Sequence, residues 1–283
     1  IETVFLLWHL TKGDLRSVEV LYGSNSISCL SLGIISRFTA EKHIVLHIHD
    51  MMTDCSFRLI LERIASHLNT VTVSEACAKE LIEHAGFASE RITIIYNGID
   101  QDQFTIDRPK RDASDIRVGY AGNLIPRKGV VHLAKAYRNL AVDNPALSLV
   151  ISSHLRDEAY FKEVAEILRT TRHHFESHER KNMPRFYNSL DVLVVPSVKD
   201  PLPTTVLEAM SCGLVVIASR VDGIPEMLPS QYLFEPGDPS DLEDVLASVI
   251  ANLENERALC SYNNPRIVAE RFSKGTKIRL MDE

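Results

Sequence analysis

The chain has 283 residues, of which 45% are hydrophobic and 24% are charged, and its formal net charge is −7. This length favours two domains, and the apolar content is sufficient for folded cores, which excludes an intrinsically disordered protein. The negative net charge argues against a general nucleic-acid-binding protein, because such proteins neutralise phosphates with lysine and arginine.

Short runs rich in β-branched residues alternate with helical segments, which predicts parallel sheets with helices on both faces. In the first half the predicted strands are 18–23, 43–49, 70–74 and 91–98. The second of these ends at His49, and Asp50 follows directly. Its alternation places one set of side chains on the same side, namely His43, Val45, His47 and His49.

A polar stretch with little periodicity, residues 98–115, predicts a linker between two domains. The predicted strands after it are 116–122, 147–153, 191–197 and 214–219. Amphipathic helices are predicted near residues 129–141 and 240–253, the second starting with a capping box of Ser240 and Glu243. We therefore expect two doubly wound α/β domains facing a cleft, with ligands beyond the carboxyl ends of the strands.

The five cysteines are odd in number and include no C-x-x-C pair: Cys29, Cys55, Cys77, Cys212 and Cys260. This pattern indicates neither a disulfide framework nor a zinc site, and it favours a reducing compartment. No run of about 18 apolar residues is present, and the first residues lack a charged start followed by a cleavage site. We expect neither a membrane span nor a signal peptide.

The stretch DPLPTTVLEAM, residues 200–210, follows the strand 191–197 and opens a helix. Thr204 and Thr205 fall at the helix start, where free N–H groups and the helix dipole favour an anion such as a phosphate. Asp200 and Glu208 are placed to accept hydrogen bonds from sugar or ribose hydroxyls. The alternative is structural, because Thr205 and Glu208 fit a capping box and Asp200 before proline is a common turn opener.

A second candidate is the stretch VGYAGNLIPRKG, residues 118–129. Gly119 and Gly122 end a strand and allow close approach of a ligand, and Arg127 and Lys128 precede a helix. Two cations there can neutralise a diphosphate, including a leaving diphosphate. The alternative is a solvated basic turn.

His49 is the third candidate, with a purely structural strand histidine as its alternative. Several well-defined motifs are missing: G-x-G-x-x-G after a strand, a Walker lysine, G-x-S-x-G, H-E-x-x-H and calcium loops. Dehydrogenase, hydrolase and metalloenzyme functions therefore have no support in the sequence.

The order of these motifs resembles the retaining GT-B glycosyltransferases of family 4. The resemblance rests on VGYAGNLIPRKG, NMPRFYNSLDVLVVPS, DPLPTTVLEAMSCGLVVIAS, DGIPEMLP and YLFEPGDPSDLEDVL, and in the first half on HIHD and TVTVSEACAKELIEHAGFASERITIIYNGID. It covers nearly the whole chain and implies two Rossmann-like domains. The two domains are a partial N-terminal acceptor-side domain (1–97) and a donor-binding domain (116–262). The linker 98–115 joins them, and a C-terminal helix (263–283) crosses back to the first domain.

The resemblance also implies roles for individual residues. Asp200 and His49 would contact the donor sugar as catalytic residues, and Glu208 would bind the nucleotide ribose. The diphosphate would lie against Lys128 and the N–H groups of Thr204 and Thr205. Gly122, Asn123 and Arg127 complete the implied donor site, and the loop 176–184 would meet the base.

Three departures from the family pattern stand out. Asp200 occupies a position where glutamate is usual, so the carboxylate reaches one methylene less far. Asn123 stands where an arginine is common, so positive charge is missing unless Arg127 supplies it. The segment VEVLYGSNS, residues 18–26, resembles about the fourth strand of the first domain, so the earlier strands have no counterpart here.

The family implies transfer of a sugar from a UDP- or GDP-sugar to a hydroxyl acceptor, a glycan or lipid-linked glycan, with retention at the anomeric carbon and without a metal or other cofactor. Polysaccharide or glycolipid biosynthesis at the cell surface is the expected setting, in the cytoplasm or peripherally at the inner face of the membrane. No nucleic-acid partner is expected, and the oligomeric state is left open. The alternatives are a nucleotide-sugar epimerase of the same architecture and a non-catalytic nucleotide-sugar-binding relative.

Overall fold

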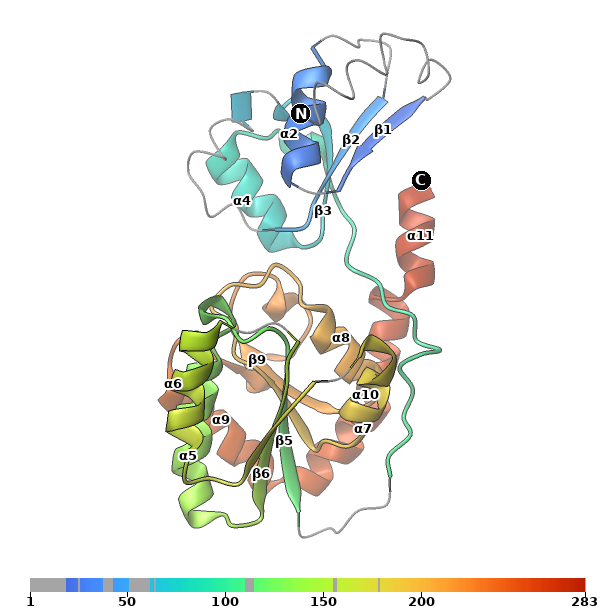
Figure 1. Cartoon of the computed structure of the whole chain (residues 1–283). Coiled ribbons are helices and arrows are strands. Elements are labelled where there is room, and N and C mark those ends of the chain that lie inside the picture. Colours follow the sequence, from blue (N-terminus) through green and yellow to red (C-terminus); the bar gives the residue numbers. More distant parts are fainter. Residues whose placement is uncertain are drawn as a thin grey trace. The chain divides into compact units, whose positions relative to one another are not determined.

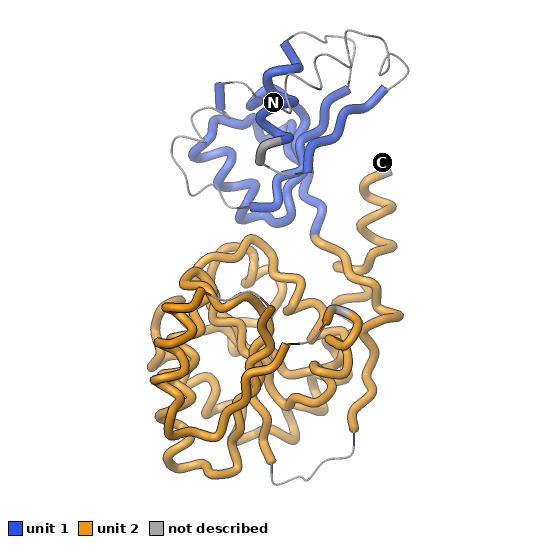
Figure 2. The backbone as a smooth tube through the Cα atoms, in the orientation of Figure 1, with its two compact units in different colours: residues 1–96 blue, residues 97–283 orange. Residues whose placement is uncertain are grey.

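A computed structural model of the chain describes residues 19–24, 26–37, 43–50, 62–63, 65–109, 115–154, 157–177 and 179–282. The chain divides into two compact units, residues 1–96 and residues 97–283 (Figure 2). Cys55 and the residues before Glu19 lie outside the described part.

Unit 1 contains a four-stranded parallel sheet in the order β1-β2-β3-β4. Its strands are β1 (Val20–Gly23), β2 (His43–Ile48), β3 (Asn69–Thr72) and β4 (Ile92–Ile94), and its helices include α2 (Ser26–Ile35) and α4 (Glu75–Ala85). The Ser74 hydroxyl caps α4 by accepting the Cys77 N–H at 3.2 Å, and Gly86 ends the helix with φ +64°. Each of the four strands overlaps one predicted for the first half, although β4 is much shorter than the predicted strand 91–98.

Unit 2 contains a six-stranded sheet in the order β10-β9-β8-β5-β6-β7, in which the paired strands are parallel. The strands are β5 (Ile116–Ala121), β6 (Leu147–Ser152), β7 (His173–Glu176), β8 (Val192–Val195), β9 (Val215–Ser219) and β10 (Leu233–Phe234). The chain runs outward from β5 to β7 and then returns to β8 beside β5, so the order reverses between β5 and β8. In doubly wound sheets such a reversal opens a crevice at the carboxyl ends of the two strands.

Helices cover both faces of this sheet, α5, α6 and α9 on one side and α7, α8 and α10 on the other (Figure 1). Their bounds are α5 (Val130–Asp143), α6 (Glu158–Leu168), α7 (Met183–Asn188), α8 (Thr204–Ser211), α9 (Pro239–Ala251) and α10 (Leu253–Arg271), followed by α11 (Lys274–Asp282). The apolar faces predicted for α5 and α9 join one buried core with the strands, through Leu133, Tyr137, Leu242 and Leu246. The two predicted sets of parallel strands, flanked by helices, are confirmed.

The structure differs from the sequence predictions at several element ends. Strands β7 and β10 were not predicted. Helix α9 is capped by Asp238, whose carboxylate accepts the Ser240 and Asp241 N–H groups, so the capping box of Ser240 and Glu243 was wrong. The residues expected as one terminal helix, 263–283, form the end of α10 and then α11.

The described part of the expected linker, residues 98–109, belongs to unit 2 and packs against its helices α7 and α8. Phe104 is buried at 3% exposure and its carbonyl accepts the Ser211 hydroxyl at 2.7 Å. The Asn188 amide accepts the Asp107 N–H at 2.8 Å and donates to the Thr105 carbonyl at 2.9 Å. These residues therefore form a fixed edge of unit 2.

Candidate functional site

The candidate site begins with the loop after β5, at the reversal of strand order. Gly122 leaves the strand with φ +150°, and its N–H bonds to the Ser152 carbonyl at 3.1 Å. A 3₁₀ turn, Pro126–Lys128, follows and ends at Gly129 with φ +66°. A Cβ atom on Gly129 would lie 1.9 Å from the Pro196 carbonyl oxygen, so only glycine allows the loops after β5 and β8 to approach this closely.

The loop after β8 meets the first loop through backbone and side chains. The Val198 N–H donates to the Arg127 carbonyl at 2.9 Å. The Lys128 ammonium pairs with the Asp200 carboxylate, with 20% and 7% of the two side chains exposed. The Ser197 hydroxyl donates to the same carboxylate oxygen at 3.1 Å. An ion pair this buried adds little net stability, because desolvation offsets the attraction, but it holds opposite charges together at the crevice.

Helix α8 starts beside this pair. Its N-cap is Pro203, and no side chain caps it, so Thr205 is not the cap and the capping-box alternative was wrong. Thr204 is exposed and Thr205 is half-buried. The first N–H groups of a helix point outward without partners in the helix, and the helix dipole favours an anion there.

Glu208 lies in the second turn of α8 and is 7% exposed. Its carboxylate accepts the Tyr187 hydroxyl at 2.7 Å. Tyr187 lies on α7 and is fully buried. A buried acidic group held by a phenol is chemically suited to accept a hydroxyl hydrogen bond as well, because a carboxylate offers about four acceptor positions.

Asn123 and Arg127 lie in the loop that leads to Lys128. The Asn123 carbonyl accepts the Tyr120 hydroxyl at 2.8 Å, which fixes the loop backbone, and the Asn123 side chain is half-buried. Burial raises the pKa of Tyr120, so this hydroxyl stays protonated and donates. Arg127 is exposed at the turn and is the cation next to Lys128.

Sequence reasoning missed Asp222, in the loop after β9. Its carboxylate accepts the Asp200 N–H at 2.7 Å. Burial raises the pKa of Asp222, while the Asp200 N–H and Lys199 oppose the shift. Among the described residues it is the one non-glycine residue with positive φ, at +46°. The turn sequence V-D-G was the available signal, but it names no partner.

In unit 1, His49 follows β2 and is half-buried. Its ring lies 3.8 Å, centroid to centroid, from that of His47. His47 is buried and contacts the Tyr22 hydroxyl. The role predicted for His49 toward the donor sugar stays a prediction.

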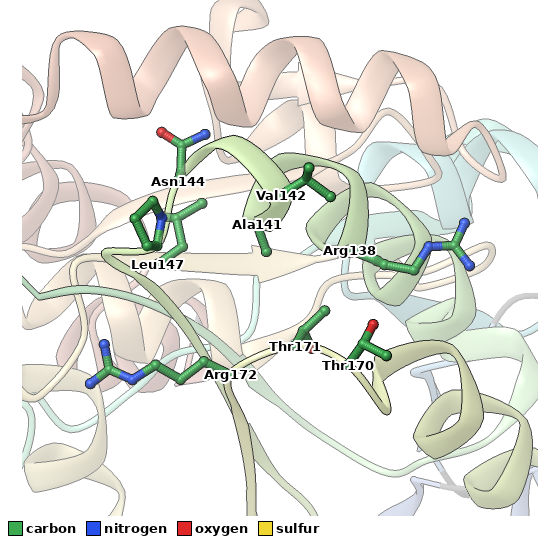
Figure 3. A pocket seen from close by; sticks show the side chains of 9 residues that line it. Arg138, Ala141, Val142, Asn144, Leu147, Thr170, Thr171 and Arg172 are labelled. Atoms are coloured by element: carbon green, nitrogen blue, oxygen red, sulfur yellow. The ribbon is translucent and has the colours of Figure 1, made fainter.

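A small cavity of about 140 Å³ lies at the opposite, amino-terminal edge of the same sheet (Figure 3). Its two guanidinium groups, from Arg138 and Arg172, point away from one another (Figure 3). Arg172 is paired with Asp115 at 3.0 Å, and the Thr171 hydroxyl donates to the Leu168 carbonyl at 2.8 Å. Its polar groups do not converge, so we place the candidate site at the carboxyl edge.

Among the described residues, no group of three or more histidine, cysteine or acidic side chains is arranged so that it could hold a metal ion. The described helices include none with the length and hydropathy required to span a membrane.

Comparison with known proteins adds family information. The family model described as glycosyl transferases group 1 matches residues 102–266, and the model of glycosyltransferase family 4 matches residues 5–103. The chain is 24% identical over 256 residues to the phosphatidylinositol N-acetylglucosaminyltransferase gpi3 subunit of Schizosaccharomyces pombe, covering 84% of this chain and 54% of that protein. It spans about half the length of the curated relatives it matches.

Two solved structures share the fold. Anabaena HepE in complex with UDP has a TM-score of 0.83 at 20% identity, covering 95% of this chain and 79% of that one. Sucrose-phosphate synthase from Thermosynechococcus elongatus has a TM-score of 0.83 at 18% identity, covering 98% and 75%. The expected architecture of two parallel-sheet α/β domains is confirmed.

Proposed function

Because the chain belongs to the glycosyl transferases group 1 family, we propose that it transfers a sugar from a nucleotide diphosphate donor to a hydroxyl acceptor. The observation that carries this proposal is the Lys128–Asp200 ion pair beside the uncapped start of α8, at the strand-order reversal. One cation, one helix start and one buried carboxylate thus meet where a sugar diphosphate would need them. The structure of HepE with UDP supports a nucleotide donor.

The donor phosphates would bind Lys128 and the N–H groups of Thr204 and Thr205. As the bond to the sugar breaks, negative charge grows on the leaving diphosphate, and preorganised donors lower the barrier by stabilising it. Arg127 and the loop backbone at Gly122 and Asn123 would complete this side of the site.

The sugar and ribose would meet the two acidic groups. Asp200 would accept sugar hydroxyls while its Lys128 partner turns toward phosphate, and Glu208 would accept the ribose diol while Tyr187 orients it. His49 is proposed to support the donor sugar. We propose that the sugar is transferred with retention of configuration and that the acceptor proton passes to the leaving phosphate, so no metal and no separate protein base take part.

We propose a glycan or lipid-linked glycan as the acceptor and surface polysaccharide or glycolipid synthesis as the setting, on the cytoplasmic side with peripheral contact at the membrane. The name of one relative, the phosphatidylinositol N-acetylglucosaminyltransferase gpi3 subunit, contains a lipid acceptor, which supports this choice.

Calorimetric titration of UDP and of GDP into this chain tests the donor site. We expect one nucleotide to bind, and Lys128→Ala to weaken it about 100-fold because a charge-assisted contact is lost. Lys162→Ala, an exposed lysine on α6, is the matched control and should bind as the wild type does.

Binding of neither nucleotide, or equal effects of the two lysine substitutions, would contradict the proposal. Product analysis with the matching nucleotide sugar then separates transfer from epimerisation, since an epimerase changes the sugar without an acceptor. Binding without turnover would favour a non-catalytic relative.

A further inference from the structure

We propose that Asp222 is a positioning residue of the donor site, whose carboxylate holds the backbone of Asp200 and thereby keeps the Asp200 side chain on Lys128. The consequence for catalysis rests on the proposed function, whereas the hydrogen bond between Asp222 and Asp200 does not depend on that function. Asp222 lies in the loop after β9, Asp200 in the loop after β8 and Lys128 in the loop after β5. Three loops at one sheet edge are thus linked through two carboxylates.

The backbone at Asp222 is strained. Residues 221–224 form a turn in which the Ile224 N–H donates to the Val221 carbonyl at 3.1 Å. Asp222 occupies the first central position with φ +46°, where turns favour glycine. Such a conformation is unfavourable for a non-glycine residue and persists where the surroundings or the function require it.

The Asp222 carboxylate accepts a hydrogen bond from one buried backbone group, the N–H of Asp200. The Asp222 carboxylate is 2.7 Å from the Asp200 nitrogen, and Asp200 is 5% exposed. Without this acceptor, the Asp200 N–H would face a buried environment, and an unpaired buried donor is costly. The loop would shift to find another partner, and the carboxylate of Asp200 would move from Lys128.

A glycine at position 222 would remove the backbone strain and the cost of a desolvated carboxylate. The aspartate therefore carries two local costs, which are set against the hydrogen bond that fixes the backbone of Asp200. Features that cost stability are expected at sites where they serve activity.

Amide hydrogen exchange at Asp200 tests the contact without any ligand. In Asp222→Gly, which keeps the φ and removes the carboxylate, we expect exchange at least tenfold faster than in the wild type. Asp222→Asn keeps an acceptor oxygen and tolerates positive φ, so it should restore most of the protection. Unchanged exchange in Asp222→Gly would overturn the proposal.

Asp241→Ala is the matched control. The Asp241 carboxylate accepts the Glu235 N–H at 2.6 Å in the loop after β10, the same kind of contact away from Lys128. Its removal should leave exchange at Asp200 unchanged. Equal acceleration by both variants would show general loosening of the loops and would also overturn the proposal.

Binding measurements test the consequence for the donor. We expect Asp222→Gly to weaken UDP-glucose binding about tenfold and to change UDP binding less than twofold, because Asp200 would serve the sugar. Added to Asp200→Ala, it should cause no further loss, since residues that act through one another are not additive.

Full additivity, or an equal loss for UDP, would contradict the positioning role. If the wild type binds neither UDP nor UDP-glucose, the proposed function fails for this donor. The exchange measurement then still decides whether Asp222 positions Asp200, so the two failures are distinguishable.

Discussion

The two edges of the six-stranded sheet carry similar residue types in different arrangements. At the carboxyl edge, Lys128 and Asp200 are paired at low exposure, and backbone hydrogen bonds tie their loops together. At the amino edge, a cavity is present, but Arg138 and Arg172 diverge around it and the side chains of the Arg172–Asp115 pair are 55% and 27% exposed. Convergence and burial of charge, rather than a hollow in the surface, therefore distinguish the candidate site.

The largest effect that we expect concerns the close approach of the two loops at the carboxyl edge. Gly129→Ala combines a positive φ with a Cβ contact of 1.9 Å to a backbone oxygen. We expect a loss of about 3 kcal/mol or more in the free energy of unfolding, which lowers Tm by roughly 6 to 12 °C. Thermal denaturation measures this directly.

Gly237→Ala is the control for Gly129→Ala. Gly237 has φ +78° with no atom within 4 Å of an added Cβ, so this substitution adds backbone strain alone, about 1 to 2 kcal/mol. A Gly129→Ala protein as stable as Gly237→Ala would show that the loops are not held tightly together.

The next effect concerns the acidic group on α8. Glu208→Gln removes the charge but keeps an acceptor for the Tyr187 hydroxyl, so we expect nucleotide affinity to fall about tenfold with a small change in stability. Tyr187→Phe should instead lower stability by about 1 to 2 kcal/mol, because it removes a buried hydrogen bond. Calorimetry and urea denaturation separate the two, and an unchanged affinity in Glu208→Gln would remove this residue from the site.

A smaller effect follows from the raised pKa of Asp222. Burial favours its neutral form in the folded state, and the Asp200 carboxylate acts in the same direction, against Lys199. The stability that the neutral form provides is full below the unfolded pKa of about 3.9 and is lost as pH rises through the higher folded pKa. The Tm of Asp222→Asn relative to the wild type should therefore rise from pH 4 to pH 7, and a constant difference would contradict the shift.

The smallest effect is expected at the amino edge. Arg172→Ala removes a partly exposed ion pair with Asp115, so stability should fall by no more than about 1 kcal/mol. Nucleotide affinity should not change in calorimetry. A loss of affinity comparable to that of Lys128→Ala would reverse our assignment of the two edges.

Much of this fold was predictable from the sequence, because strands such as 147–153 are short, apolar and β-branched. Strand β7 was missed because HHFE carries no such pattern, and β10 because it has two residues. These strands exist through pairing with neighbours that local patterns do not reveal.

The candidate site was predictable in part. Lys128 and Asp200 were named separately, and the structure brings them together across 72 positions in the chain. The capping box at Thr205 and Glu208 was wrong because Tyr187, 21 residues earlier, contacts Glu208 and because the helix begins at Thr204. Asp222 was missed because a V-D-G turn has no sequence feature that identifies a distant amide as its partner.

The packing of residues 98–109 against α7 and α8 determines at which residue a fragment containing unit 2 must begin. A fragment beginning at residue 116 would lack Phe104 and expose the surface against which Phe104 packs. Such a truncation would remove the two groups that bond to the Asn188 amide, the Asp107 N–H and the Thr105 carbonyl. It would also remove the bridge from Ile99 to Ser273, which joins the start of unit 2 to the turn between α10 and α11. A fragment designed to begin at residue 97 keeps these contacts and is the one to express for studies of the donor-side fold.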